Sequence, residues 1–368
     1  MIIGVDGNDA NVTEQVGVSV YTRNLLEYFQ KVADKERQFT VFLRQPPVSI
    51  LPKETEFFKY QVVKAKIFWS QIFLPLSLYF KNKVNVFFSP AHYSPRFCPV
   101  PTVVTIHDLA YFYYPDEFLK KDLFKLQKWT KYSIEKAKKV IAVSKTTKKD
   151  LTKFYNLSDS KITVVYNGYE KTLLKDKLQP RFPLITYDLK PQQYILYVGT
   201  LQPRKNIQVL IQAFKKFYAK NPTFRLMLVG KKGWLYEHIF EEVTLLNLEN
   251  AVTFTGYIPD NEVTELYKHA YCYVLPSLYE GFGIPVLEAM SHSCPVISSF
   301  ASSLSEVGGE AAIYFDPENV NGLVDDLESL KNEKLRDELI QKGQERIKLF
   351  SWEKCAKETL DVITSVRA

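Results

Sequence analysis

The chain has 368 residues, of which 46% are hydrophobic and 24% are charged. That length corresponds to two domains, and those proportions are typical of a soluble globular protein. The N-terminal strand lacks the features of a signal peptide, and the longest apolar-looking run, residues 67–80, is too short and too interrupted to span a bilayer. No pair of the four cysteines has the C-x-x-C spacing of a zinc or redox site, so we expect reduced thiols and a cytoplasmic protein.

The net charge of +7 is concentrated in one segment of the chain. Residues 120–149 hold eleven lysines against two acids, a local charge of +9 that leaves about −2 for the remainder. A solvated helix face is the simplest explanation, and an acidic acceptor or an anionic membrane surface at the inner face of the membrane is the alternative. No nucleic-acid recognition motif accompanies the charge, so nucleic acid is not an expected partner.

A second unusual segment, residues 57–84, holds eight aromatic residues and five lysines but no acid. Two interpretations stay open at this point. The segment is either a core helix flanked by lysines or a surface that receives a lipid-linked acceptor at the membrane.

In the first half of the chain, short apolar runs alternate with helical patterns. The strands are expected at residues 2–6, 39–43, 86–89, 103–106, 140–143 and 162–165, and the clearest helices at residues 20–32 and 119–136. This alternation predicts a parallel sheet with helices on both faces. Residues 170–193 hold three prolines and show little periodicity, so we expect a linker there.

The second half repeats the scheme. Strands are expected at residues 194–198, 226–229, 252–255, 272–275, 296–298 and 313–315, and helices at residues 206–218, 235–246, 261–269, 285–291, 320–330, 333–349 and 352–366. The predicted fold class is therefore α/β, with two Rossmann-like domains at residues 1–175 and 190–350 and a ligand in the cleft between them. Neither half carries a full G-x-G-x-x-G or a G-x-x-x-x-G-K-[ST] motif, which argues against a nicotinamide dehydrogenase and a P-loop NTPase.

The most informative stretch is residues 272–299, where a strand is followed by a glycine-containing loop and a helix that begins at Pro285. Glu280 is expected in the loop, and Glu288 in the first helical turn. A helix N-terminus behind glycines offers backbone N–H groups to an anion, and two acids offer acceptors to hydroxyl groups. The stretch therefore predicts a sugar-nucleotide pocket. The alternative is an ordinary loop-to-helix turn whose acids are solvated.

Further candidates follow other predicted strands. Gly17 could bring backbone N–H groups to a phosphate or be a plain turn glycine. His107 and Asp108 could bind sugar hydroxyls, although a lone histidine is more often structural. Ser144 and Asn167 could contact a ligand or close a cap and a turn.

Arg204 and Lys205 follow the strand that ends before Gly199, where two cations would neutralise a leaving diphosphate. A surface pair of cations is the alternative. The chain holds no D-x-D triplet, so a catalytic metal ion is not expected. No other cofactor is expected either.

The combination resembles the retaining glycosyltransferases of family 4, which have the two-domain GT-B fold, over essentially the whole chain. The segment Glu280-Gly-Phe-Gly-Ile-Pro-Val-Leu-Glu288 matches the E-x7-E signature of that family. Supporting segments are residues 105–109, 143–145, 166–168, 204–206 and 303–308. The resemblance also implies that the C-terminal helix, residues 352–368, crosses back onto the N-terminal domain.

The resemblance implies a role for each matching residue. Arg204 and Lys205 would hold the diphosphate of the donor, Glu288 the ribose, and Glu280 and His107 the sugar. The residues expected at the donor are Gly17, Ser144, Asn167, Gly199, Arg204, Lys205, Tyr257, Ile258, Glu280, Gly281, Phe282, Gly283, Ile284 and Glu288, and those expected in catalysis are Glu280, His107, Arg204 and Lys205. Two departures from the family pattern are the single Gly17 in place of paired glycines and Thr200 in place of an arginine.

The expected reaction is a front-face displacement that retains the anomeric configuration, with no metal ion. The sequence looks most like bacterial mannosyltransferases of polysaccharide assembly, so GDP-mannose is the first expected donor and UDP- or ADP-glucose the second. The expected acceptor is a glycan or a lipid-linked saccharide. A sugar-nucleotide epimerase and a non-catalytic sugar-nucleotide-binding protein are the alternatives from other classes.

Overall fold

The computed structural model describes all residues except 16, 66, 81–82, 170–181 and 367–368. The described chain forms two compact units, residues 1–168 with 350–368 and residues 169–349. We call them unit 1 and unit 2 and describe each by itself. Position 175, where the first domain was expected to end, lies outside the described residues.

Unit 1 contains a seven-stranded sheet in the order β3-β2-β1-β4-β5-β6-β7, and every pair of neighbouring strands is parallel. Its strands are β1 Ile2–Asp6, β2 Gln38–Leu43, β3 Phe58–Val62, β4 Val86–Ser89, β5 Thr102–Ile106, β6 Lys139–Ala142 and β7 Ile162–Val164. All side chains of β4 and β5 are buried, as expected for central strands of a parallel sheet that is covered on both faces.

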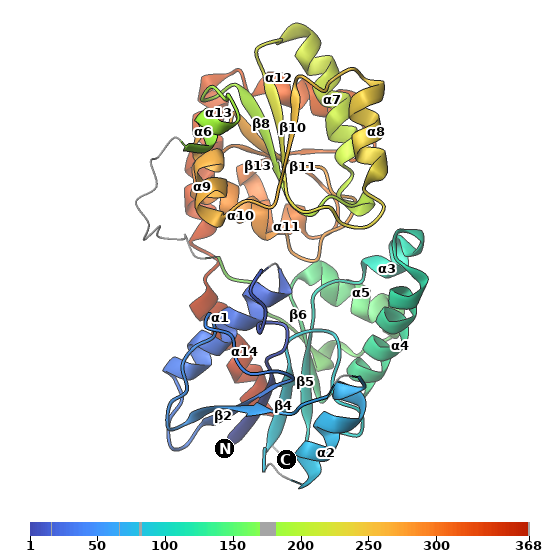
Figure 1. Ribbon diagram of the computed structural model, residues 1–368, viewed down its shortest axis with the longest axis vertical. Helices are drawn as coiled ribbons and strands as arrows, with labels where there is room; N and C mark the ends of the chain where they lie inside the picture. Colours follow the sequence, from blue (N-terminus) through green and yellow to red (C-terminus); the bar gives the residue numbers. More distant parts are fainter. Residues whose placement is uncertain (16, 66, 81–82, 170–181, 367–368) are drawn as a thin grey trace. The chain divides into compact units, whose positions relative to one another are not determined.

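Helices cover both faces of this sheet (Figure 1). The helical segments are α1 Val18–Lys31, η1 Trp69–Phe73, α2 Leu74–Phe80, α3 Ala110–Tyr113, η2 Pro115–Glu117, α4 Lys120–Lys136, α5 Lys145–Tyr155, η3 Asp159–Lys161 and α14 Trp352–Ser365. The C-terminal helix α14 packs beside α1, so it does return to the N-terminal unit.

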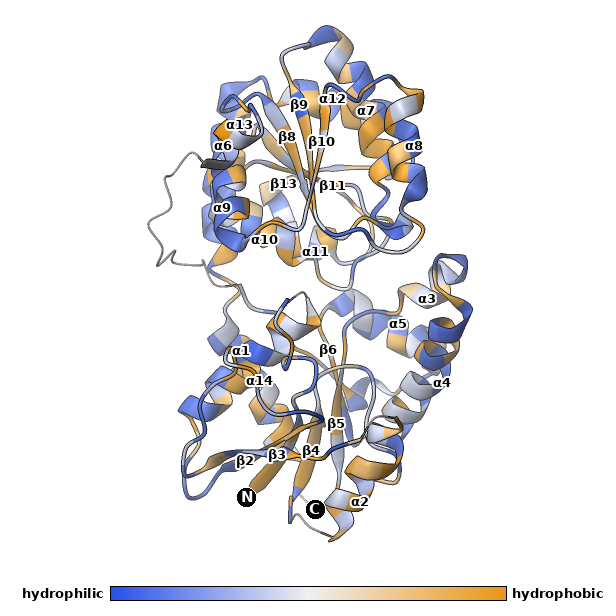
Figure 2. Cartoon of the chain, in the orientation of Figure 1, coloured by the Kyte–Doolittle hydropathy of each residue, from blue (hydrophilic) through white to orange (hydrophobic). Residues whose placement is uncertain are grey.

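Unit 2 contains a six-stranded parallel sheet in the order β10-β9-β8-β11-β12-β13. Its strands are β8 Tyr194–Val198, β9 Arg225–Val229, β10 Val252–Gly256, β11 Cys272–Leu275, β12 Val296–Ser299 and β13 Ala312–Phe315. Its helical segments are α6 Phe182–Thr186, η4 Pro203–Lys205, α7 Ile207–Lys220, α8 Glu237–Leu245, α9 Asp260–His269, α10 Ile284–Ser291, α11 Leu304–Gly308, η5 Gly309–Ala311, α12 Val320–Ser329 and α13 Glu333–Ile347. Figure 2 shows the hydrophobic residues gathered on the strands in both units.

The strand order places a topological switch point in unit 2. β8 is the first strand in the chain, and its neighbours β9 and β11 lie on opposite sides of it. The connections after β8 and β11 therefore leave in opposite directions and open a crevice at their carboxyl ends, which is where doubly wound sheets bind ligands. The loops that begin at Gly199 and at Pro276 emerge at this point.

Most predicted elements are present within two residues of their expected bounds, but two regions differ. Residues 58–62 form the edge strand β3, although the surrounding segment was predicted as a helix or a membrane surface. An edge strand alternates polar and apolar side chains, and here Lys59 and Gln61 interrupt the apolar pattern. Within the expected linker, residues 182–186 form α6, which packs against α9.

No helix in the described part of the chain is both long and apolar enough to span a bilayer. The four cysteines are free thiols, of which Cys98 is half-buried and the others are buried.

A tight approach of two backbones joins the end of the first sheet to the C-terminal helix. A Cβ atom at Gly168 would lie 2.2 Å from the backbone N of Trp352, the first residue of α14. Only glycine lets the chain pass α14 at this distance, because backbone atoms, unlike a flexible side chain, do not move aside.

We therefore expect Gly168→Ala to lower the free energy of unfolding by about 3 kcal/mol. Gly256→Ala is a suitable control, because Gly256 has a φ of 69° but no atom within 4 Å of the added Cβ. That change should cost only the backbone strain, about 1 kcal/mol. Urea denaturation monitored by circular dichroism measures both, and equal losses would contradict the proposed clash.

Candidate functional site

The loop after β11 is fixed by hydroxyl groups from the loop after β12. The backbone N–H of Glu280 donates to Ser302 Oγ at 2.7 Å, and Ser302 Oγ donates in turn to the carbonyl oxygen of Glu280 at 2.7 Å. Ser303 Oγ donates to the carbonyl oxygens of Glu280 and Phe282 at 2.8 and 3.1 Å. Two serines thus hold the backbone of this loop in a single position.

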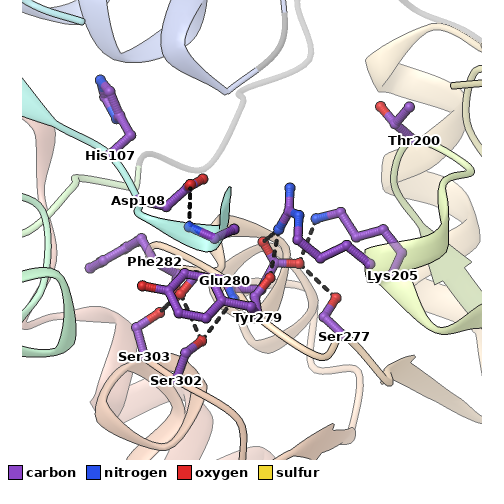
Figure 3. A network of polar contacts seen from close by, with 12 residues as sticks. His107, Asp108, Thr200, Lys205, Ser277, Tyr279, Glu280, Phe282, Ser302 and Ser303 are labelled. Carbon is purple, nitrogen blue, oxygen red and sulfur yellow. Dashed lines mark hydrogen bonds and ion pairs between the residues drawn. The ribbon is translucent and has the colours of Figure 1, made fainter. Parts of the chain in front are cut away.

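The carboxylate of Glu280 is buried and meets two cations (Figure 3). Lys205 Nζ donates to Oε1 at 2.5 Å, and Arg204 Nη1 lies 3.5 Å from Oε2. Ser277 Oγ donates to Oε1 at 2.6 Å. The cations come from the loop after β8 and the acid from the loop after β11, so the strand order of the sheet brings together residues that lie 75 positions apart.

Two opposing effects act on the pKa of Glu280. Burial raises it, but the charges of Lys205 and Arg204, together with the hydrogen bonds from Lys205 and Ser277, hold the pKa below its ordinary value of 4.5. Glu280 is therefore a charged carboxylate at neutral pH.

The two cations are held by the backbone around them. Arg204 Nη1 donates to the carbonyl oxygen of Tyr279, and the N–H of Leu278 donates to the carbonyl oxygen of Arg204 at 2.9 Å. Asn206 lies in the left-handed region with a φ of 54°, and its side-chain amide donates to the carbonyl oxygens of Pro276 and Pro317. The short η4 segment thus presents one guanidinium group and one ammonium group from a rigid turn.

Helix α10 begins at Ile284, one residue before the predicted start at Pro285. Gly283 is the N-cap, with a φ of 98°, and a Cβ there would lie 2.6 Å from Leu304 Cδ2. The first turn of the helix leaves backbone N–H groups without intrahelical acceptors, as an anion site requires. Glu288 is the fifth residue of α10, so its predicted place in the first turn was wrong.

The carboxyl group of Glu288 has one hydroxyl donor. Tyr267 OH donates to Oε2 at 3.2 Å, and burial keeps the pKa of Tyr267 well above its ordinary value, so that the phenol stays a donor. Burial, aided by the charge of Asp260, raises the pKa of Glu288 to about 7, although the bond from Tyr267 opposes this shift. Glu288 therefore changes its charge near physiological pH.

Three further predicted residues lie at the carboxyl ends of β8 and β10. The N–H of Gly199 donates to the carbonyl oxygen of Val229 at 2.9 Å. Tyr257, directly after β10, is half exposed, and Lys231 Nζ lies 5.1 Å from the centre of its ring. Ile258 is buried. An exposed aromatic ring beside a cation offers a stacking surface for a planar base.

In unit 1, His107 directly follows β5. Its Nε2 lies 2.8 Å from the carbonyl oxygen of Pro90, which can only accept, so Nε2 carries the proton and Nδ1 is an acceptor. Burial, with the nearby His92 ring, lowers the pKa of His107 to about 4, so the imidazole is neutral at physiological pH. The ring meets Tyr21 edge to face at 4.9 Å. Asp108 Oδ1 accepts the N–H of Ala110 at 3.1 Å.

The other predicted residues of unit 1 have separate local roles. Gly17 is the N-cap of α1 with a φ of 40°, and nothing lies within 4 Å of an added Cβ. Ser144 caps α5 by accepting the N–H of Thr147 at 3.0 Å and is fully buried, which accounts for this serine without a ligand. Asn167 is buried, and its Oδ1 has no donor among the described residues. Contacts of these residues with a donor stay predictions.

The hydrogen bonds that support the two acids were not predicted from the sequence. Ser277, Ser302 and Ser303 hold Glu280, and Tyr267 bonds Glu288. The serines lie in loops directly after β11 and β12, so their position behind strands was the available signal, but isolated serines are also typical of turns. Within the described residues, no three His, Cys, Asp or Glu side chains are grouped closely enough to hold a metal ion.

Comparisons with known proteins agree with this architecture. Residues 16–172 match the family model described as Glycosyltransferase Family 4, and residues 188–346 match that of Glycosyl transferases group 1. The structure of sucrose-phosphate synthase from Thermosynechococcus elongatus superposes with a TM-score of 0.79 at 21% identity, covering 99% of this chain and 98% of that one.

Two curated relatives are bacterial enzymes. O-antigen chain mannosyltransferase B of Escherichia coli is 33% identical over 267 residues, which are 70% of this chain and 69% of that protein. O-antigen chain mannosyltransferase RfbU of Salmonella typhimurium is 35% identical over 216 residues, which are 59% of this chain and 57% of that protein. With two Rossmann-like units, a buried acid–cation cluster at a switch point and these matches, the chain belongs to the family 4, group 1 glycosyltransferases of the GT-B fold.

Proposed function

We propose that this glycosyltransferase moves a mannosyl group from GDP-mannose to a saccharide acceptor of polysaccharide assembly, without a metal ion and with retention of the anomeric configuration. The observation that carries the proposal is the pairing of Glu280 with Lys205 and Arg204 at the switch point of unit 2. Two fixed cations beside a helix N-terminus suit a diphosphate, and a buried carboxylate beside them suits sugar hydroxyls.

In the proposed reaction, the bond between the anomeric carbon and the diphosphate oxygen breaks, and the electron pair leaves with the diphosphate. Arg204 and Lys205 stabilise this developing negative charge. The acceptor hydroxyl oxygen attacks the anomeric carbon from the side of the leaving group, and its proton passes to the departing diphosphate oxygen. The configuration is retained because bond breaking and bond formation occur on one face.

Glu280 does not suit the role of nucleophile in this scheme. Its carboxylate is occupied by Lys205, Arg204 and Ser277, which hold it at the cations. We assign it two other tasks, to fix the two cations where the diphosphate leaves and to accept a hydrogen bond from the donor sugar. His107, a residue of unit 1, is a neutral imidazole whose Nδ1 can accept a hydrogen bond from a sugar hydroxyl.

The choice of mannose rests on the relatives, two of which are named as O-antigen chain mannosyltransferases. The same relatives support a growing glycan or lipid-linked saccharide as the acceptor. The choice of a nucleoside diphosphate rests on the site, where Glu288 suits a ribose and the ring of Tyr257 suits a base.

A panel of donors tests this proposal. GDP-mannose, UDP-glucose, UDP-N-acetylglucosamine and ADP-glucose are each incubated with the chain, a saccharide acceptor and a chelator, and the released nucleoside diphosphate is measured. We expect turnover with GDP-mannose and an axial anomeric product by NMR. An inverted product, a preference for another donor or an absolute need for a metal ion would each contradict the corresponding part of the proposal. An isomerised sugar nucleotide in place of transfer would identify an epimerase.

The raised pKa of Glu288 leads to a pH-dependent affinity for the donor. A charged carboxylate binds ribose hydroxyls more strongly than a neutral carboxyl group does. With a pKa of about 7, Glu288 is mostly charged at pH 8 and mostly neutral at pH 6. The KM for the donor should therefore rise several-fold as the pH is lowered from 8 to 6.

Initial rates at a series of donor concentrations from pH 6 to 8 measure this effect. The control is Glu288→Gln, whose KM should be high and nearly independent of pH. His107 does not interfere, because its pKa of about 4 lies well below this range. A constant KM in the unaltered protein would show that Glu288 does not bind the donor as a carboxylate.

A further inference from the structure

One helical segment of unit 1 is apolar on the outside as well as on the inside. Its inner side chains, Trp69, Leu74 and Leu78, are buried in a core cluster with Phe42 and Phe87 of the sheet. The outer side chains are nevertheless hydrophobic, and they are exposed at Ile67, Phe68, Ile72, Phe73, Leu76, Tyr79 and Phe80. Figure 2 colours α2 as hydrophobic.

The outer side chains form a continuous face. Ile72, Leu76 and Tyr79 follow each other at spacings of four and three residues, which places them on one side of a helix. Phe80 is 81% exposed and Ile67 is 67% exposed. Of the 21 large hydrophobic side chains that are exposed in the described chain, seven lie in these 14 positions. A helix that is hydrophobic all round is normally buried or in contact with lipid.

A neighbouring loop extends the apolar face. The N–H of Arg96 donates to the carbonyl oxygen of Ser70 in η1 at 3.1 Å, and the next residue, Phe97, is 71% exposed. This loop is tied to α4, because the N–H of Phe97 donates to Tyr132 OH and the guanidinium of Arg96 lies over the Tyr132 ring.

Positive charge borders the face. Arg44 lies 6.0 Å from the centre of the Trp69 ring, and with Lys64 it lines a hollow of about 630 Å³. Neither cation forms an ion pair within the described residues. Lys83 is exposed just beyond α2, and Lys128 is exposed on α4, one turn before Tyr132. The sequence contains no acid from residue 57 to residue 107.

We propose that this face, which consists of residues 67–80 with Phe97 and is bordered by Arg44, Lys64 and Lys83, binds the surface of an anionic lipid bilayer. The outer aromatic and aliphatic side chains enter the boundary between headgroups and acyl chains, and the cations meet lipid phosphates in the hollow and around it. The charge selects a bilayer over a second copy of the chain, because two such faces would bring like charges together.

The binding does not depend on the proposed transfer reaction. It would place unit 1 at the surface where a lipid-linked saccharide presents its sugar, and so it would raise the local concentration of such an acceptor. A failure of membrane binding and a failure of sugar transfer are seen in separate experiments, since sedimentation with vesicles requires no turnover.

Sedimentation of the full chain with lipid vesicles tests the proposal. One set of vesicles contains phosphatidylcholine alone, and the other also contains phosphatidylglycerol. We expect the unaltered protein to bind the anionic vesicles far more strongly, and added salt to weaken this binding.

Two double variants separate the apolar and the charged contributions. Phe73→Ser with Phe80→Ser should lower the partition coefficient by at least about tenfold. Lys64→Glu with Lys83→Glu should remove the preference for anionic vesicles. The matched control is Leu245→Ser, which removes an exposed leucine of unit 2 and should leave binding unchanged. The melting temperature of each variant confirms that it is folded.

Three results would overturn the proposal. The first is that the unaltered protein stays in the supernatant with anionic vesicles. The second is that Leu245→Ser loses as much binding as the Phe73 and Phe80 variant. The third is a dimer on size exclusion that the Phe73 and Phe80 variant converts to a monomer, without any vesicle binding, which would assign the face to a second copy of the chain.

Discussion

Replacement of Glu280 by Gln is expected to lower kcat by about 10²–10³-fold while the protein stays folded. Gln has nearly the same volume as Glu and still offers an oxygen to Ser277 Oγ. The loop also keeps its backbone bonds to Ser302 and Ser303. The change therefore removes the charge but keeps the volume of the side chain and the backbone bonds of the loop.

The physical reason for the loss lies in the two cations. Lys205 and Arg204 are aligned by the carboxylate, at 2.5 and 3.5 Å. Without its charge their side chains regain freedom, and a diphosphate that leaves meets cations that must first be reoriented. Stabilisation of a transition state depends on charges that are already in place, so the loss is expected in kcat more than in the binding of GDP.

Release of GDP at saturating donor measures kcat, and calorimetry measures the binding of GDP. The matched control is Glu265→Gln, because Glu265 is another buried carboxylate of unit 2 with a lysine partner, Lys268 at 2.5 Å, but it lies on α9. This control should keep its kcat. A Glu280→Gln protein with kcat within twofold of the unaltered protein would remove Glu280 from the mechanism.

The central strands of both sheets could be predicted from the sequence because they are continuous apolar runs. β4 and β11 have exactly the predicted bounds, and every residue in them is buried. The edge strand β3 could not be predicted in this way, because only Phe58 in it is fully buried and its polar residues face water. An edge strand has a neighbouring strand on one side only, and which strands become neighbours depends on tertiary structure.

The same limit applies to the charged segment at residues 120–149. Its lysines lie largely on α4 and α5, and α5 was not predicted because lysines and threonines obscure its periodicity. Its N-cap, Ser144, was noted both as a candidate ligand contact and as a possible cap. A serine behind a strand suits either purpose. The hydrogen bond from the N–H of Thr147 shows that Ser144 caps α5, and its contact with a donor stays a prediction.

Candidate residues for the site could be selected from the sequence, but the way in which they come together could not. Glu280, Glu288, Arg204 and Lys205 were all identified from local motifs. The pairing of Glu280 with Lys205 across 75 positions follows from the fact that β11 lies beside β8, and a sequence with repeated βα units does not specify which strands become neighbours. The raised pKa of Glu288 likewise depends on tertiary structure, because it results from burial and from the charge of Asp260, against the hydrogen bond from Tyr267.

Replacement of Lys205 by Met is expected to reduce turnover by a factor similar to that for Glu280→Gln and, in addition, to destabilise the protein by about 3 kcal/mol at pH 7. Met keeps the unbranched shape of the side chain but leaves the buried Glu280 with Arg204 as its remaining ionic partner. A buried charge that has lost a partner is costly, whereas an uncharged pair at the same place is not.

The pH dependence of this destabilisation provides a sharper test. In the unaltered protein the pKa of Glu280 is below 4.5, so its contribution to stability is present above that pH and is lost as pH falls through the folded-state pKa. In the Lys205→Met protein burial should prevail and raise the pKa above 4.5. The folded state then binds the proton more tightly than the unfolded state, and stability falls as pH rises.

The difference in unfolding free energy between the two proteins should therefore be small at pH 4 and grow towards pH 7. Urea denaturation at both pH values measures it. The double variant, Glu280→Gln with Lys205→Met, should lack this pH dependence, because the carboxyl group whose pKa changes is no longer present. A loss of stability that is independent of pH and additive in the double variant would mean that Lys205 acts by packing alone. The ion pair would then not be what holds the site together.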